Sequence, residues 1–155
     1  MVVAPGIPLS RGLPSPTTDL DYVQTKDPEG GLSHSLQTGL AAIPDGFGAA
    51  AILLADQPEI GADLINLVIA EAITSDAVAT RPLFTGLGGA VPGHPFVLMR
   101  RAFADADRLK DEEGARALFR DKPSALHHLE IATEPPRDID TPADYADLLA
   151  KLQVP

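Results

Sequence analysis

Two acidic segments of the sequence carry side chains that could hold a divalent cation. In AAAILLADQPEI, residues 49–60, a run of small and apolar residues ends at Asp56, and Pro58 prevents a strand from continuing. In DIDTP, Asp138 and Asp140 are separated by one residue, so they face the same way if the segment is extended. Carboxylate oxygens are the ligands that Mg²⁺ prefers in proteins. Acids from two strand ends could therefore share one Mg²⁺.

Both acidic segments also have an ordinary structural interpretation. Asp56 could begin a turn or cap a helix that starts near Glu59, since Asp and Pro are common turn residues. Asp140 could merely lead into the final helix, for which Thr141 is a suitable N-cap, Pro142 the first residue and Asp144 a favourable acid in the first turn. Spacing alone leaves both interpretations open.

A glycine–serine segment, GGLSHSLQTGL, could contact a ligand through its backbone and hydroxyls. Gly30 and Gly31 allow close approach of the backbone, and Ser33 and Ser35 lie near a helix start, with Ser33 the expected N-cap. The segment lacks the Gly-Lys-Ser/Thr ending of a P-loop. A glycine turn that leads into a capped helix is the ordinary alternative.

The histidines give weaker signals. His94, in GHPFVL, follows a glycine-rich loop, but a single histidine more often has a structural role. His127 and His128 are adjacent on an expected strand, so they point to opposite faces and form a poor metal pair.

Composition narrows the class of protein. The chain has 155 residues, 45% of them hydrophobic, which suits one globular domain over residues 1–155. It has a net charge of −10 with scattered Lys and Arg, so we expect no nucleic-acid partner. No apolar run reaches the roughly 20 residues of a membrane span, and no secretory signal is evident. The absence of cysteine excludes disulfides and thiolate sites and favours the cytoplasm.

Hydrophobic periodicity predicts alternating strands and helices. The segment MVVAPG is expected to end a strand, residues 7–18 and 85–93 are expected to be loops, and 59–76 is the clearest helix. Its apolar stripe comprises Leu64, Ile65, Val68, Ile69, Ala72 and Ile73. The other expected strands are 19–25, 48–56, 77–84, 94–99 and 125–133, and the other expected helices are 33–43, 100–111, 114–122 and the C-terminal one. The alternation predicts an α/β fold with a mainly parallel sheet, in which strand 48–56 is central and covered on both faces.

Five motifs in this order resemble the molybdenum-cofactor cytidylyltransferase group of MobA-like nucleotidyltransferases. They are GLSHSLQTGLAAI, AAAILLADQPEI, GHPFVLMRRAF, EEGARALFR and DIDTPADYADLL, and they span about residues 22 to 152. The resemblance implies a Rossmann-like three-layer fold of the nucleotide-diphospho-sugar transferase type. It also implies transfer of CMP or GMP from CTP or GTP to a molybdopterin-type phosphorylated acceptor.

The resemblance also implies roles for individual residues. Asp56 would bind magnesium and act in catalysis, with Asp140 as the second acid and Asp138 as the other candidate. Gly31 and Ser35 would help to hold the nucleotide. The acceptor side would be lined by Gly93, His94 and Pro95.

One family feature has no counterpart here. The family opens with a glycine-rich LAAG…R-G…K segment that wraps the triphosphate, and no such stretch occurs in this sequence. The resemblance therefore implies the C-terminal portion of the family fold, with weak or absent transfer by the chain alone. We also expect self-association into homo-oligomers through an uncovered sheet edge or an apolar face near the middle of the sheet. The alternative is a non-catalytic remnant or binding module with the same fold.

Overall fold

The computed structural model describes residues 2–3, 15, 17, 20–25 and 27–152. The chain divides into two compact units, one formed by Met1–Ala50 and Leu98–Ala125 and the other by Ala51–Val97 and Leu126–Pro155. Most of the expected loop 7–18 lies outside the described residues. Among the residues that the structure describes, none of the helices combines the length and the hydrophobicity that a membrane-spanning helix needs.

The elements alternate as the periodicity predicts, with shorter strands. The strands are β1 (Val2–Val3), β2 (Val23–Gln24), β3 (Ala49–Ile52), β4 (Ala79–Phe84), β5 (Val91–Pro92), β6 (Phe96–Met99) and β7 (Leu126–Ile131). The α-helices are α1 (Gly31–Ala41), α2 (Ala62–Thr74) and α3 (Pro142–Leu152). The 3₁₀ helices are η1 (Pro28–Gly30), η2 (Arg100–Arg108), η3 (Ala115–Phe119) and η4 (Pro123–Ala125).

The sheet is mixed. Strand order in the larger sheet is β3-β6-β4-β5, with β7 also paired to β4, while β1 and β2 form a separate parallel pair. β7 runs parallel to β4 and β5 runs antiparallel to it. The prediction of a central, covered strand at 48–56 is wrong, because β3 is a terminal strand of this order and is only partly buried. The prediction failed because a run of small alanines is apolar whether the strand lies at the centre or at the edge of a sheet.

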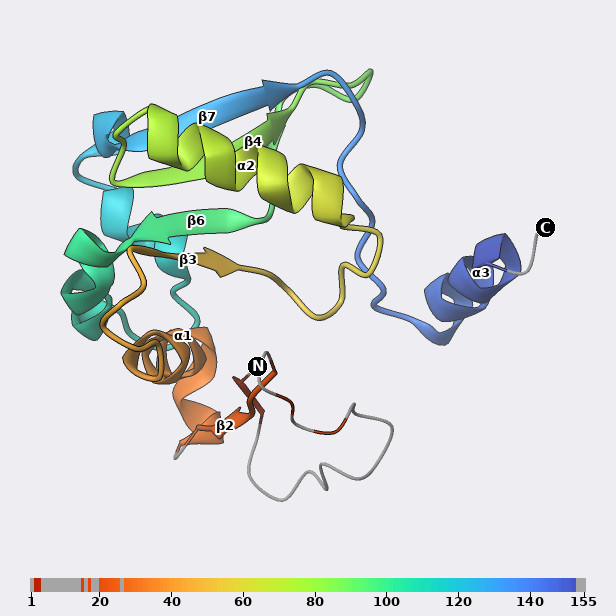
Figure 1. Ribbon diagram of the computed structural model, residues 1–155. Coiled ribbons are helices and arrows are strands. Elements are labelled where there is room, and N and C mark those ends of the chain that lie inside the picture. The colour runs from red at the N-terminus through yellow and green to blue at the C-terminus, as the bar shows by residue number, and fades with distance from the viewer. Residues whose placement is uncertain (1, 4–14, 16, 18–19, 26, 153–155) are drawn as a thin grey trace. The chain divides into compact units, whose positions relative to one another are not determined.

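In the unit that contains α2, the helix packs on β4 and β7 (Figure 1). Val68 and Ala72 of the predicted stripe are buried against this part of the sheet. Ile73 is 67% exposed, so the stripe ends before it and that part of the prediction is wrong. The buried hydrophobic residues of this unit are Val68, Ala72, Ala79, Phe84, Phe96 and Val97.

In the unit that contains α1, the helix packs against η1 and η2. Gln37 donates through Nε2 to the carbonyl oxygens of Ala106 and Leu109, at 2.9 and 3.2 Å. The expected N-cap, Ser33, instead lies within the helix, where its Oγ donates to the Gly30 carbonyl oxygen at 3.2 Å. The helix begins earlier than predicted because Asp27 caps η1 immediately before it.

Two expected elements differ in type. Residues 100–108 form a 3₁₀ helix rather than an α-helix, as do residues 115–119. The stretch 100–108 has only nine residues, so the spacing of its apolar residues does not distinguish a 3₁₀ helix from an α-helix. The expected loop 85–93 contains β5, whose Val91 pairs with Phe84.

Candidate functional site

The loop after β3 and the segment after β7 are joined by two hydrogen bonds. The Ile139 N–H donates to the carbonyl oxygen of Asp56 at 2.8 Å. The Gln57 side chain donates through Nε2 to Oδ1 of Asp138 at 2.7 Å. Figure 1 shows the chain between β7 and α3 passing beside the loop that leads into α2. The fold therefore brings Asp56 and Asp138, which are far apart in the sequence, to neighbouring loops of this unit.

Asp56 does not cap a helix. α2 begins at Ala62, and its N-cap is Gly61, which has no side chain. The Asp56 side chain is exposed, within a turn in which Gln57 N–H donates to the Leu54 carbonyl oxygen at 3.4 Å. Of the two ordinary interpretations, the turn is therefore observed and the cap is not.

His94 lies in the electrostatic field of the same acids. The side chain is half-buried, and burial is the largest influence that lowers its pKa. The positive charge of Arg81 lowers this pKa further, whereas the negative charges of Asp56 and Asp138 raise it. The net direction is downward, so a neutral imidazole with one nitrogen able to accept a hydrogen bond is favoured near neutral pH.

Arg81 is a buried cation on β4, only 7% exposed. Its Nε donates to the Gly93 carbonyl oxygen at 3.2 Å, and its guanidinium lies 5.7 Å from the centre of the Phe96 ring. These contacts place a fixed positive charge beside the segment Gly93–Pro95. A lone arginine in a strand has no distinctive local pattern, so the sequence does not place Arg81 at this segment.

The segment Gly93–Pro95 is held by backbone contacts. Gly93 N–H donates to the Pro82 carbonyl oxygen at 3.0 Å, and Pro95 is buried after a cis peptide bond. A Cβ at Gly93 would lie 2.4 Å from Cε2 of Phe84, so the ring can pack there only against glycine.

Asp140 belongs to the start of α3. Thr141 Oγ1 accepts from the Asp144 N–H at 3.2 Å, and Oδ2 of Asp144 accepts from the Thr141 N–H and hydroxyl at 2.8 and 2.7 Å. Thr141 thus caps the helix as predicted. These bonds to Thr141 lower the pKa of Asp144, and the backbone N–H of Asp140 contributes in the same direction. Asp138, rather than Asp140, has the side-chain bond to the loop of Asp56.

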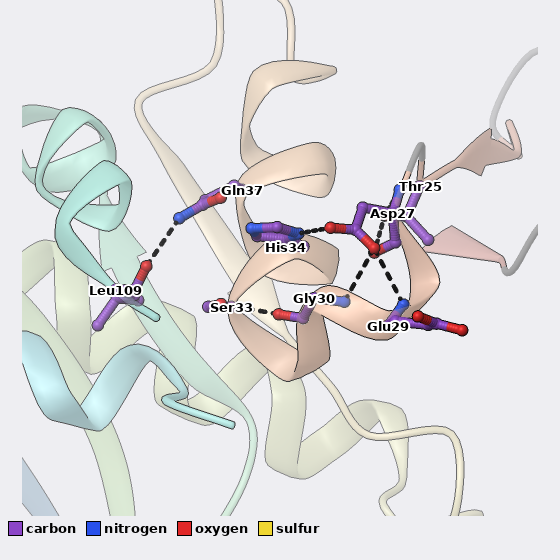
Figure 2. Close-up of polar contacts among 8 residues, drawn as sticks. All are labelled: Thr25, Asp27, Glu29, Gly30, Ser33, His34, Gln37 and Leu109. Atoms are coloured by element: carbon purple, nitrogen blue, oxygen red, sulfur yellow. Dashed lines mark hydrogen bonds and ion pairs between the residues drawn. The ribbon is translucent and has the colours of Figure 1, made fainter. Parts of the chain in front are cut away.

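The glycine–serine segment lies in the unit that contains α1, and Figure 2 shows its polar contacts. Gly31 has φ of 71°, and a Cβ there would lie 2.5 Å from the Asp111 carbonyl oxygen. Ser33 is buried and its N–H donates to that same oxygen at 3.0 Å. Gly31 is therefore required for local packing, and Ser35 is half-buried on the helix.

Figure 2 also shows a pair that sequence analysis missed. Asp27 accepts the N–H groups of Glu29 and Gly30 through Oδ1, at 3.2 and 3.1 Å, while its Oδ2 lies 3.2 Å from Nδ1 of His34. The pair lines an open groove of about 540 Å³ between β2 and α1. The only local signal was Asp27 before a proline, a common capping pattern.

A hard cation fits the donor set after β3 and β7. Asp56 and Asp138 supply carboxylate oxygens, and the Gln57 Oε1 is buried and accepts no hydrogen bond from a described residue. Such an orphaned acceptor costs about 1–3 kcal/mol unless water or a ligand satisfies it. Among the described residues no three His, Cys, Asp or Glu side chains converge on one point. Two carboxylates completed by waters and phosphate oxygens are a usual set for Mg²⁺.

Comparison with known proteins gives the family of this α/β protein. Residues 1–129 match the MobA-like NTP transferase domain, and the chain belongs to this family. The purine catabolism protein PucB of Bacillus subtilis is 32% identical over 123 residues, which cover 77% of this chain and 57% of PucB. The chain thus spans little more than half of that curated relative.

Solved structures share the fold. A homologue of Mycobacterium tuberculosis Rv0371c from Mycobacterium sp. strain JC1 matches with a TM-score of 0.71 and 28% identity, over 88% of this chain and 66% of that one. Rv0371c of Mycobacterium tuberculosis itself matches with a TM-score of 0.70 and 24% identity, over 88% and 67%. A structure of Rv0371c in complex with manganese matches with a TM-score of 0.70 and 22% identity, over 96% and 76%.

Proposed function

We propose that this chain is the nucleotidyltransferase part of a MobA-like enzyme that transfers CMP or GMP from the triphosphate to a molybdopterin-type phosphorylated acceptor. The observation that supports it best is the joining of the Asp56 loop to the Asp138 segment by the 2.8 and 2.7 Å hydrogen bonds. Membership of the NTP transferase family supplies the reaction class. The molybdopterin-type acceptor rests on the motifs alone.

In this reaction an acceptor phosphate oxygen attacks the α-phosphorus of the triphosphate. A new phosphorus–oxygen bond forms, the bond from the α-phosphorus to the α,β-bridging oxygen breaks, and pyrophosphate leaves with that electron pair. Catalysis of this kind depends on positioning and on stabilising phosphate charge. A Mg²⁺ held by Asp56 with Asp138 or Asp140 would supply charge neutralisation when bound. The manganese in the Rv0371c structure supports a divalent cation in this role.

The protein's own groups then divide between two substrates. Gly31 and Ser35 would contact the nucleotide, and Gly93, His94 and Pro95 would line the acceptor side. Since burial and Arg81 lower the pKa of His94, its neutral imidazole is suited to accept a hydrogen bond from the acceptor. Arg81 brings positive charge to the segment that would receive the acceptor's phosphate.

The test is pyrophosphate release from CTP and from GTP with a pterin phosphate acceptor and MgCl₂. The sequence predicts weak release from this chain alone. We expect Asp56→Ala to abolish the release that is measured, whereas Asp147→Asn, which removes an exposed carboxylate from α3, leaves it unchanged. Nucleotide binding without release would favour the binding module. Release that persists in Asp56→Ala would refute the assignment of the metal acid.

A further inference from the structure

Gln57 links the two halves of the candidate cation site. Its Nε2 donates to Oδ1 of Asp138 at 2.7 Å, and because a carboxylate only accepts, this bond also fixes which amide atom is nitrogen. The Oε1 of the same side chain is buried and accepts no hydrogen bond from any described residue. The contact with Asp138 is therefore the interaction that orients the amide.

The neighbouring acid, Asp140, is in a different setting. Its backbone N–H contributes to the cap of α3, beside the Asp144 carboxylate. Burial lowers the pKa of His94 most and Arg81 lowers it further, whereas the negative charges of Asp56 and Asp138 raise it. Asp138 and Asp140 are two residues apart in one segment, and it is Asp138 whose side chain is bonded to the loop of Asp56.

We propose that Gln57 is a positioning residue that selects Asp138, rather than Asp140, as the second cation ligand beside Asp56. The proposal rests on the proposed function, since it concerns the same cation. The amide holds Oδ1 and thereby restricts the rotamers of an otherwise exposed carboxylate, which leaves Oδ2 available for the cation. The buried Oε1 adds an acceptor suited to a water bound to that cation. Partners of this outer kind typically change metal affinity about 10- to 100-fold.

The experiment measures Mn²⁺ binding to the whole chain by the loss of the free-ion electron paramagnetic resonance signal, with and without CTP. Asp138→Asn and Asp140→Asn are matched variants, because each removes one carboxylate charge from the same segment. We expect Asp138→Asn to weaken binding at least tenfold and Asp140→Asn to change it less than about twofold. Gln57→Ala should weaken binding about tenfold, at the lower end of the range for outer partners because the site is exposed. Asn66→Ala, at an exposed amide of α2, should have no effect.

A double variant distinguishes positioning of Asp138 by Gln57 from a general loss of structure. If Gln57 acts through Asp138, Gln57→Ala should add little to the loss already caused by Asp138→Asn. Gln57→Met approximates the length of the side chain but removes the donor without adding a charge, so it should weaken Mn²⁺ binding as well. Circular dichroism melts of each variant establish that the fold is retained.

Two kinds of result would overturn the inference. Equal losses in Asp138→Asn and Asp140→Asn, a larger loss in Asp140→Asn, or additive losses in the double variant overturn the role of Gln57 while the proposed function stands. Failure of the unmodified chain to bind Mn²⁺, even with CTP, overturns both this inference and the cation of the proposed function.

Discussion

The N–H of Ile139 donates a 2.8 Å hydrogen bond to the carbonyl oxygen of Asp56, joining segments more than eighty residues apart in the sequence. Because both groups are backbone atoms, substitution of the flanking acids leaves this connection in place. Side-chain variants at Asp56 therefore report on charge and ligand binding more than on folding, whereas variants at Asp138 also alter the acceptor of the bond from Gln57.

Gly93→Ala should destabilise the protein by about 1–3 kcal/mol, the usual cost of overpacking. The new Cβ would lie 2.4 Å from Cε2 of the Phe84 ring, which is only 1% exposed and has little room to move. Urea unfolding measures the change. Gly46→Ala is the control, since nothing lies within 4 Å of its added Cβ. Equal stability of the two variants would contradict the observed packing.

The cap of α3 should make the helix sensitive to acid. Hydrogen bonds to Thr141 lower the pKa of Asp144, so the unfolded helix binds a proton more readily than the folded one. The stabilisation is present above the ordinary aspartate pKa of about 3.9 and is lost as the pH falls through the lower, folded value. Nuclear magnetic resonance shifts of α3 should show this loss in the unmodified chain and not in Asp144→Asn. Asp147→Asn should retain the acid transition, and its absence there would refute the cap as the cause.

Exposed apolar side chains on α3 should promote self-association. Tyr145, Leu149 and Leu152 are 55%, 38% and 72% exposed and follow helical spacing along one side. We expect light scattering to show mass increasing with protein concentration, and Leu149→Lys with Leu152→Lys to reduce it. Leu67→Lys, at a 50% exposed position of α2, is the control. A concentration-independent monomer would refute the expectation.

Hydrogen bonds between residues that are close in the sequence were the easiest part of the structure to predict. Thr141 and Asp144 hydrogen-bond each other within a single turn, and Pro142 is the first residue of the helix, so their pattern suffices to predict the start of α3. Ser33 shows the limit of the same reasoning. Its hydroxyl suits a cap, yet Asp27 already caps the preceding η1, and the helix continues back from Ser33 to Gly31.

The candidate site was only partly predictable because some of its contacts join residues that are far apart in the sequence. That Asp56 and Asp138 follow strands is visible in the sequence, but the preference for Asp138 depends on the bond from Gln57, which is 81 residues distant. Likewise, Arg81 reaches Gly93 only because β4 and β5 pair. Contacts of this kind depend on tertiary structure and leave no periodic signal.

The central claim is that the carboxylate of Asp56 helps to bind a triphosphate through a divalent cation. Isothermal titration of CTP and GTP into the unmodified chain and into Asp56→Ala, each with and without MgCl₂, tests it most directly. We predict binding of at least one nucleotide that requires Mg²⁺ and is weakened at least tenfold, about 1.4 kcal/mol, in Asp56→Ala. Nucleotide binding that is equally strong without Mg²⁺, or unchanged in Asp56→Ala, would contradict the claim.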